Sequence, residues 1–392
     1  MNPALLQQDV QAFIRENQDI DTTKLILKGS PFKGINSSEL AMQIIGLKKA
    51  KKKLPTWYKS PDIIYPPNLN LEQTSSEITA RYKAELVSGK SLIDLTGGLG
   101  IDSFFFAEKI EKVTHCEMDP SLSEIAEHNL KHLGAENIST IAGDSLEYLK
   151  STNEYFDWIY LDPARRDDYG GKIFLLEQCT PNVPINLDLF FKKARRVLIK
   201  TSPLLDLKAG ITELKKVAEI HVIAVNNEVK ELLWLLDPAS TSEVVIKTIN
   251  IRKNSVQKFE GKFSGLSLVS GLSMPQEYLY EPNAAIMKSG LFGTLSSVTG
   301  TEKLHMNSHL YTSGELIEFP GRRFKVLEVM AYQRKLLKKD LRLKKANITT
   351  RNFPKSVEAI RKELRIEDGG TVYAFFTTNL RDEKVVVLCE KI

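Results

Sequence analysis

Between Lys90 and Leu236 the sequence alternates short β-type runs with segments of helical length. The predicted strands are 91–95, 112–117, 138–142, 156–161, 196–201, 219–225 and 231–236, with a further one at 243–251. Intervening segments such as 101–110 and 121–133 are predicted helices. Strands that alternate with helices in this way are typical of a parallel, doubly wound α/β sheet. The chain is therefore predicted to have an α/β core.

The first of these strands runs directly into a glycine-rich turn, LIDLTGGLGID (92–102). Gly97, Gly98 and Gly100 would let a ligand approach the backbone at the carboxyl edge of the sheet, where open α/β folds bind cofactors. Dinucleotide enzymes share such a turn, but Ser103 stands where their G-x-G-x-x-G pattern has its third glycine. Asp94 ends the strand, and a carboxylate there would repel a pyrophosphate. These two residues argue against a dinucleotide-binding oxidoreductase.

Acidic residues also follow the next three predicted strands. Glu117 ends the second strand, where a carboxylate can accept hydrogen bonds from ribose hydroxyls. Asp144 follows the third strand and is placed to meet an adenine amino group. The fourth strand leads into Asp162-Pro163-Ala164-Arg165. Because the carboxyl ends of parallel strands meet at one edge of a sheet, these residues are expected near the glycine turn.

In order and spacing these four motifs resemble those of the class I (Rossmann-like) S-adenosylmethionine-dependent methyltransferases. The resemblance covers about residues 74–240. It implies a seven-stranded Rossmann-like methyltransferase sheet, a methyl-transferring enzyme and S-adenosylmethionine as the cofactor, with Asp94 near its cationic methionyl end. The implied cofactor-binding residues are Asp94, Thr96, Gly97, Gly98, Gly100, Asp102, Glu117, Met118, Asp144, Ser145 and Asp162.

The fourth motif departs from the pattern of the amino-methylating members of this family, D/N-P-P-Y/F/W. The resemblance implies that the acid and a backbone carbonyl hold the target N–H while the aromatic ring stacks on a base. In this chain Arg165 replaces the aromatic residue, so stacking must come from elsewhere, for example from Tyr169, or not occur. Asp162, Pro163 and Arg165 are the predicted catalytic residues.

Asp162 is expected to orient or deprotonate the nucleophile. Arg165 and Arg166 are expected either to hold an anionic part of the substrate or to form ion pairs with nearby acids such as Asp167. The loop contains no cysteine for covalent catalysis, which favours direct in-line methylation.

Basic charge is concentrated towards the end of the chain. Residues 321–365 contain 15 Lys and Arg against 4 Asp and Glu, a local net charge of +11 in a chain whose total is +5. A large anionic partner such as a nucleic acid explains this stretch, and so does a solvated helix face. The predicted RNA phosphate contacts here are Arg322, Arg323, Lys344, Lys345 and Arg351.

The segments YEPNAAIMKSG (280–290), FPGRRFKV (319–326) and NITTRNFPKSVEAIRKEL (347–364) resemble the tail of a bacterial family of methyltransferases. Members of that family carry a ferredoxin-like segment followed by a THUMP-like domain, and true THUMP domains accompany tRNA-modifying enzymes. The expected domains are an N-terminal helical region (1–73), the S-adenosylmethionine-dependent methyltransferase domain (74–252), a connecting or ferredoxin-like segment (253–319) and a small THUMP-like basic α/β domain (320–392).

The three cysteines form no CxxC motif or Cys/His cluster, so no metal site and no disulfide framework are expected. Apolar runs are of strand length and the start of the chain lacks signal-peptide features, so no membrane partner and a cytoplasmic location are expected. The sequence predicts an RNA methyltransferase acting on tRNA or rRNA. Two alternatives stay open: a methyltransferase of a protein or small molecule, and a non-catalytic RNA-binding protein with this fold.

Overall fold

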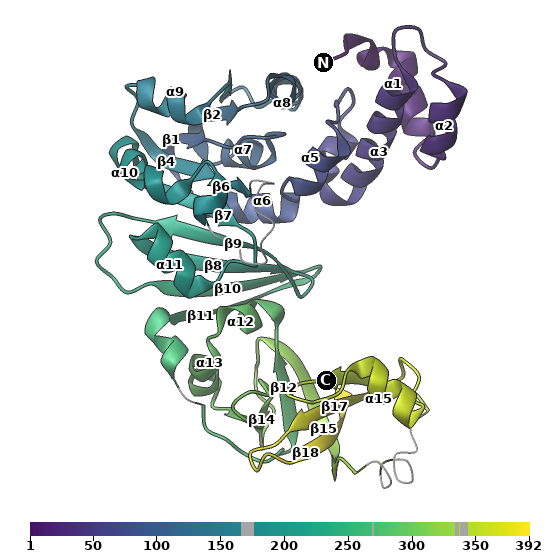
Figure 1. Ribbon diagram of the computed structural model, residues 1–392, viewed down its shortest axis with the longest axis vertical. Coiled ribbons are helices and arrows are strands. Elements are labelled where there is room, and N and C mark those ends of the chain that lie inside the picture. The colour runs from purple at the N-terminus through teal and green to yellow at the C-terminus, as the bar shows by residue number, and fades with distance from the viewer. Residues whose placement is uncertain (166–175, 269, 334–336, 338–343) are drawn as a thin grey trace. The chain divides into compact units, whose positions relative to one another are not determined.

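A nine-stranded sheet contains all eight strands predicted before residue 253. The computed structural model describes residues 1–165, 176–268, 270–333, 337 and 344–392 (Figure 1). The strand order is β11-β10-β8-β9-β7-β4-β1-β2-β3, and β1 pairs in parallel with both β2 and β4. The strands are β1 (Gly89–Asp94), β2 (Ile110–Glu117), β3 (Ile138–Ala142), β4 (Phe156–Leu161), β7 (Ala194–Thr201), β8 (Val217–Val225), β9 (Glu228–Leu236), β10 (Val245–Arg252) and β11 (Ser255–Lys262).

The sheet has two strands more than the seven that the resemblance implies, and both extend it at one edge. β10 lies parallel to β8, and β11 lies antiparallel to β10 from Arg252↔Ser255 to Val245↔Lys262. The predicted connecting or ferredoxin-like segment, 253–319, thus begins with a strand of the large sheet. The sequence of β11, SVQKFEGK, has no buried residue, so backbone pairing with β10 forms the strand rather than burial of an apolar face.

Helices cover the central strands, and the acids at the strand ends begin two of these helices. α7 (Ile101–Phe106) and α8 (Pro120–His132) pack on β2, and α10 (Val183–Lys193) packs on β7 (Figure 1). The side chain of Asp119 accepts hydrogen bonds from the amides of Ser121 and Leu122 and caps α8. α9 (Ser145–Ser151) and α11 (Leu207–Leu214) complete this set. The predicted helix 101–110 ends early, at Phe106.

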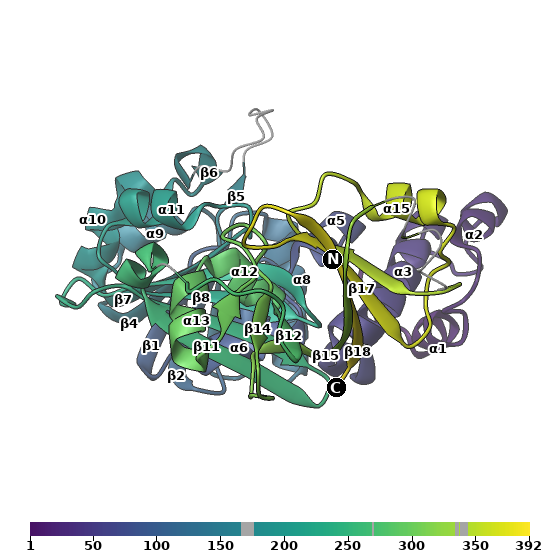
Figure 2. The same cartoon turned by 90° about the horizontal axis from the view of Figure 1, so that it is seen from below.

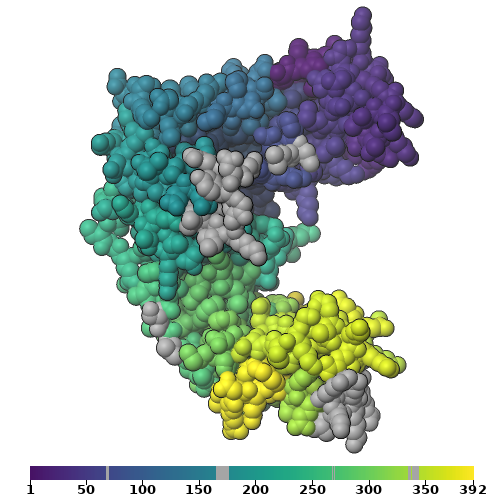
Figure 3. Space-filling view, viewed as in Figure 1, coloured from purple at the N-terminus to yellow at the C-terminus, as the bar shows by residue number. Residues whose placement is uncertain are grey.

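The first 84 residues form the helices that the sequence predicts there. They are η1 (Pro3–Leu6), α1 (Gln8–Glu16), α2 (Thr22–Lys28), α3 (Ser37–Lys53), α4 (Pro55–Lys59), α5 (Asn68–Gln73) and α6 (Glu77–Ala84). Trp57 packs against Phe104 of α7 with ring centroids 4.9 Å apart. The side-chain amide of Asn129 on α8 exchanges two hydrogen bonds with the backbone of Ile64. The helical residues therefore join the first strands in one body (Figure 3).

The described residues form two compact units. The first comprises Met1–Val217 and Trp234–Ser240, and the second Ala218–Leu233 and Thr241–Ile392. None of the helices within the described ranges is long and apolar enough to cross a membrane.

The second unit contains a seven-stranded sheet of order β13-β14-β12-β15-β18-β17-β16. Its strands are β12 (Tyr278–Pro282), β13 (Glu302–Lys303), β14 (Tyr311–Ser313), β15 (Gly321–Ala331), β16 (Asn347–Thr350), β17 (Val372–Thr378) and β18 (Lys384–Lys391). The helices α12 (Ala284–Ser289), α13 (Phe292–Thr299) and α15 (Val357–Leu364) accompany it, and Figure 2 shows them from a second direction. β12 and β15 are antiparallel neighbours, so the predicted boundary at residue 320 falls between paired strands of one sheet.

Candidate active site

The turn after β1 faces open space at Gly98 and packs closely against β2 at Gly97. Gly98 and Gly100 have φ of +55° and +80°, left-handed values that favour glycine. A Cβ atom placed on Gly98 would have no atom within 4 Å, whereas one on Gly97 would lie 2.2 Å from Nε2 of His115 on β2. Next to Gly98, therefore, a ligand can approach the backbone.

Glu117 at the end of β2 is fixed by the same turn. Its Oε2 accepts a hydrogen bond from the Gly98 amide at 2.8 Å, and its Oε1 accepts one from the Asp119 amide at 2.9 Å. Each carboxylate oxygen retains a second lone pair that can accept from a hydroxyl group. Met118 follows with 59% of its surface exposed, so an apolar side chain lies beside this acid.

Asp144 and Ser145 lie where the chain leaves β3 and enters α9. The Asp144 carboxylate caps α9, with Oδ1 accepting from the amides of Leu146 at 2.8 Å and Glu147 at 3.2 Å. Asp144 is exposed and Ser145 is buried. One Asp144 oxygen is thus engaged in capping, a local role that the spacing of the motifs did not reveal.

Asp94 is directed into the protein rather than towards solvent. It is 1% exposed, and its two oxygens accept from the Thr96 amide at 3.0 Å and the Ser103 hydroxyl at 2.7 Å. Burial raises the pKa of this carboxyl to about 7. Asp94 therefore holds the shape of the turn, while its predicted contact with a cationic cofactor group stays a prediction.

Asp102, on the first turn of α7, is the centre of a buried polar cluster. Lys83 Nζ lies 2.9 Å from its Oδ1, and the hydroxyls of Ser75 and Tyr160 each donate to its Oδ2 at 2.8 Å. Burial alone raises the pKa of Asp102, but the ammonium groups of Lys83 and Lys200 outweigh it and hold the pKa below its ordinary value. The cluster ties the end of the helical region to β4.

Sequence reasoning missed Lys83, which lies on α6. The sequence pattern T-x-x-E at Thr74 and Glu77 matches a capping box, but the observed cap of α6 is Ser76, whose side chain accepts from the Thr79 amide. Glu77 instead accepts from the hydroxyl of Thr56 at 2.9 Å. The capping-box pattern covers only one helical turn, so it could not reveal this partner, which lies 21 positions away in the sequence.

Asp162 is held from two sides at the end of β4. Its amide donates to the hydroxyl of Thr96 at 2.6 Å, and its Oδ2 forms an ion pair with Nζ of Lys200. Asp162 is 32% exposed at its side chain and Lys200 is 13% exposed, so the pair lies at the edge of the sheet with one face towards solvent. The acid and the glycine turn are therefore brought together, as the motifs predict.

Lys200 was not among the predicted site residues. It is the penultimate residue of β7, a strand that is otherwise largely buried, and a lysine at the carboxyl end of such a strand is the signal that could have identified it. Pro163, which follows Asp162 in the sequence, is buried, and Ala164–Arg165 form the two-residue strand β5 against β6 (Cys179–Thr180). Arg166 and Tyr169 lie outside the described residues.

The predicted RNA-contacting residues lie in the second unit, where four of them form ion pairs. Arg322 Nε and Arg351 Nη2 both contact the buried carboxylate of Glu281, at 2.6 and 2.8 Å. Arg323 pairs with Glu318 at 2.6 Å and Lys345 with Glu367 at 3.4 Å, while Lys344 is exposed. The structure thus brings Arg322 and Arg351 together on one acid.

Comparison with known proteins decides the family. Residues 278–320 match a ferredoxin-like domain model, and residues 321–391 match a THUMP domain-like model. A solved structure from Porphyromonas gingivalis W83, named as a "putative methyltransferase", is 31% identical, superposes with a TM-score of 0.89, and the match covers 99% of this chain and 98% of that one. This chain belongs to that methyltransferase family.

Two further relatives of the methyltransferase carry informative names. An uncharacterized S-adenosylmethionine-dependent methyltransferase of Mycobacterium tuberculosis is 26% identical over 302 residues, covering 76% of this chain and 79% of the relative. An uncharacterized RNA methyltransferase of Mycoplasma mobile is 35% identical over 77 residues, covering 20% of this chain and 21% of the relative. The protein is an S-adenosylmethionine-dependent enzyme, as its motifs predict.

The residues at the sheet edge fit this cofactor. The space next to Gly98 gives a ligand access to the backbone of the turn, and Glu117 is held with acceptor capacity beside it. S-adenosylmethionine supplies a sulfonium methyl group that is already activated for displacement, so the methyltransferase must supply position, alignment and exclusion of water.

The buried Asp94 gives the methyltransferase a pH-dependent stability. In the unfolded chain this carboxyl titrates near ~4, and in the folded protein near 7, so between these values the folded state holds a proton that the unfolded state has lost. Raising the pH through this window therefore costs stability. Asp94→Asn, whose oxygen can accept from the Thr96 amide while its NH2 group donates to the Ser103 hydroxyl, is expected to raise the free energy of unfolding by roughly 4 kcal/mol at pH 8 and by little at pH 4.

Denaturant unfolding of the two proteins at both pH values measures this difference. Asp188→Asn, at an exposed position on α10, is the control and should change stability equally at pH 4 and pH 8. Equal stability of wild type and Asp94→Asn at pH 8 would show that the buried carboxylate carries no such cost.

Proposed function

We propose that this methyltransferase methylates RNA by direct in-line transfer to a base or ribose atom of tRNA or rRNA. The observation that carries the proposal is the match of residues 321–391 to a THUMP domain-like model, because true THUMP domains accompany RNA-modifying enzymes. The name of the Mycoplasma mobile relative supports the same substrate. The net charge of +11 over residues 321–365 provides electrostatic attraction to a polyanion.

The proposed cofactor seat is the edge formed by the ends of β1, β2 and β3. The backbone of the turn at Gly97, Gly98 and Gly100 would bind the cofactor, and Glu117 would accept from its ribose hydroxyls. Met118 and the start of α9 at Asp144 and Ser145 would hold its adenine ring. Asp94, Thr96 and Asp102 act as positioning residues, since their polar atoms are bonded within the protein.

Asp162 is the proposed contact to the reacting group. Its carboxylate would accept the hydrogen bond of the target N–H or O–H, so that the nucleophile's lone pair points at the methyl carbon. When bound, S-adenosylmethionine would supply the methyl group and leave as the thioether, and Asp162 or water would accept the proton that the nucleophile loses. Lys200 keeps Asp162 in place. Pro163 follows Asp162 in the motif. Arg165 and Arg166 are proposed to bind an anionic part of the substrate.

The ion pairs of Arg322, Arg323, Lys345 and Arg351 are compatible with RNA phosphate contacts. A guanidinium group has five N–H donors, and each of these arginines uses only part of them in the bonds described. Together with the exposed Lys344 these residues would give affinity that depends on salt and is blind to sequence.

The test is methyl transfer in the presence of a labelled methyl donor. The purified protein is incubated with total RNA, total protein or a small-molecule extract, and the label incorporated into each fraction is measured. We expect label in RNA, a loss of at least ~100-fold with Asp162→Asn because the acceptor geometry is disturbed, and full activity with Asp188→Asn. Label confined to the protein or small-molecule fraction would overturn the RNA substrate. RNA binding with no incorporation in any fraction would favour a non-catalytic RNA-binding protein.

A further inference from the structure

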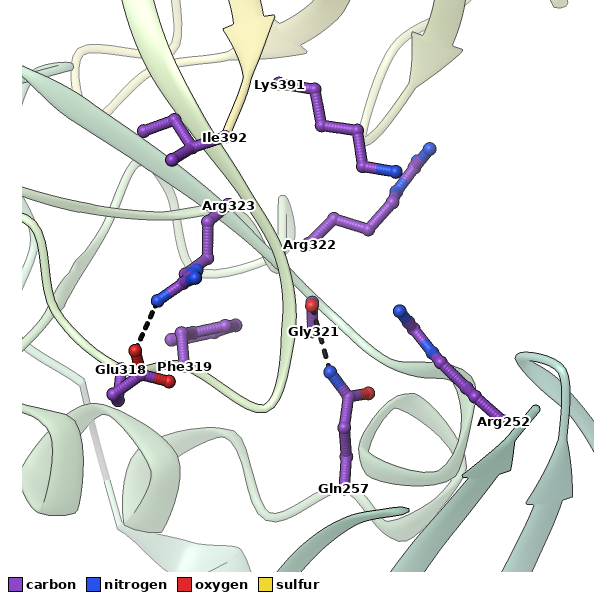
Figure 4. Close-up of a pocket in the computed structure, with 9 residues that line it drawn as sticks. All are labelled: Arg252, Gln257, Glu318, Phe319, Gly321, Arg322, Arg323, Lys391 and Ile392. Carbon is purple, nitrogen blue, oxygen red and sulfur yellow. Dashed lines mark hydrogen bonds and ion pairs between the residues drawn. The ribbon is translucent and has the colours of Figure 1, made fainter. Parts of the chain in front are cut away.

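The second unit contains a pocket of about 220 Å³ that none of the sequence motifs predicted. It is lined by the end of β10 at Arg252, by Gln257 on β11, by the segment from Glu318 to Arg323 and by the end of β18 at Lys391. Figure 4 shows the charged ends of Arg252, Arg322 and Lys391 on one side of this pocket, and Arg323 turned towards Glu318 on the other.

Positive charge exceeds negative charge among the side chains of this pocket. Four lining side chains are cationic and Glu318 is the one acidic side chain among the lining residues, a side-chain net of +3. Arg323 is paired with Glu318, and Arg322 shares Glu281 with Arg351. Within the described part of the chain, the side chains of Arg252 and Lys391 form no ion pair. Such an excess of like charge is unfavourable unless an anion compensates it.

The backbone around the pocket is closely fixed. Gln257 Nε2 donates to the carbonyl of Gly321 at 3.1 Å. A Cβ atom on Gly321 would lie 2.0 Å from the carbonyl oxygen of Glu281, so the glycine lets β12 and the start of β15 approach this closely. Phe319 is 6% exposed and packs on Tyr280 with ring centroids 5.0 Å apart. The segment that carries Arg322 and Arg323 is therefore held in place before any ligand binds.

We propose that this pocket binds a phosphodiester group of the RNA substrate, an inference that rests on the proposed function. Arginine forks match the oxygens of a phosphate group, and a lysine adds a point charge. The volume suits one phosphate and its flanking atoms rather than a flat stretch of duplex. The pocket lies where the ferredoxin-like match ends and the THUMP domain-like match begins, with the β10–β11 hairpin as its third wall. An RNA strand with a phosphate in this pocket would therefore contact all three segments.

The experiment measures how RNA affinity of the full chain depends on salt. A fluorescently labelled single-stranded RNA is titrated at several KCl concentrations with wild type and with the double variant Arg252→Gln/Lys391→Gln. Loss of one bound phosphate should reduce the magnitude of the negative slope of log K against log[KCl] by about 0.7. The double variant should therefore show a slope smaller in magnitude by about 0.7 and bind several-fold more weakly at low salt.

Two controls separate the pocket from general charge. Arg252→Lys/Lys391→Arg keeps both charges and should keep the slope. Lys258→Gln removes one positive charge from an exposed position next to Gln257, on the opposite face of β11, and should leave the slope unchanged. Thermal unfolding midpoints of all variants check that each remains folded.

The outcomes distinguish the pocket from the substrate class. If wild type binds and methylates RNA but the double variant keeps the wild-type slope, the pocket proposal is wrong and the RNA substrate stands. If wild type neither binds nor methylates RNA, both proposals fall. Stabilisation by inorganic phosphate that requires Arg252 and Lys391, with no RNA binding, would also overturn the RNA site and assign the pocket to a small phosphate compound.

Discussion

Gly97→Ala is expected to abolish binding of S-adenosylhomocysteine to the purified protein, with a loss of at least ~100-fold in affinity. The new Cβ would lie 2.2 Å from Nε2 of His115, well inside the ~3.5–4 Å separation of non-bonded atoms. His115 is fully buried on β2, so its ring has no room to retreat. The turn must move instead, and it carries with it the Gly98 amide that fixes Glu117. Calorimetric titration measures the loss.

A second substitution tests the cause. His115→Ala in the Gly97→Ala background removes the ring that the new methyl group meets, and should restore most of the affinity. Gly134→Ala is the control for a loss of stability alone, because its φ of +79° strains the backbone of an alanine, whereas a Cβ there would meet no atom within 4 Å. It should lower stability by about 1–2 kcal/mol and leave affinity unchanged. Wild-type affinity in Gly97→Ala, or a folded double variant without recovery, would contradict the argument.

Most strands at the centre of the large sheet were predictable because they contain runs of buried apolar residues. β4 is apolar at all but one position, β7 contains the buried run Val197–Ile199, and each predicted strand overlaps an observed one. β11 could not be found in this way. Its polar sequence forms a strand through pairing with β10, and pairing with a partner is not encoded in the local alternation of residues.

The motifs predict acids at the ends of neighbouring strands, but they do not show what the oxygens of these acids contact. Glu117 and Asp162 end their strands beside the glycine turn, as parallel topology requires. Asp94 accepts a hydrogen bond from the glycine turn, and Asp144 accepts one from the first turn of α9. The spacing of the motifs could not predict these short-range contacts. The roles of these residues towards the cofactor stay predictions.

The lysines were missed because their partners are far away in sequence. Lys83 and Asp102 are 19 positions apart, and Lys200 lies 38 positions from Asp162. A single sequence offers no signal for such a pairing except an isolated cation in a buried element. The same limit applies to the tail, where a count of basic residues could not show that Arg322 and Arg351 share Glu281.

Lys200→Met is expected to reduce the turnover number for methyl transfer by about 100-fold while changing the affinity for S-adenosylhomocysteine by no more than several-fold. The ammonium group of Lys200 fixes the Asp162 carboxylate from β7, whereas the cofactor seat is built from the ends of β1, β2 and β3. Without the ammonium group, the carboxylate of Asp162 loses the partner that fixes its position. Lys200→Arg, which retains a charged donor, should recover part of the rate.

Steady-state kinetics and calorimetry separate the two effects, and Lys247→Met provides the matched control. Lys247 forms an ion pair with Glu219 at 2.8 Å between β10 and β8 of the same sheet, so its loss tests the cost of removing such a pair away from the proposed site. A further variant tests whether Lys200 works through Asp162. If it does, Asp162→Asn/Lys200→Met should be no slower than Asp162→Asn alone. In that background the Asp162 carboxylate is already gone, so Lys200→Met has no carboxylate left to displace. Additive losses in the double variant would instead assign Lys200 a contact of its own with the substrate.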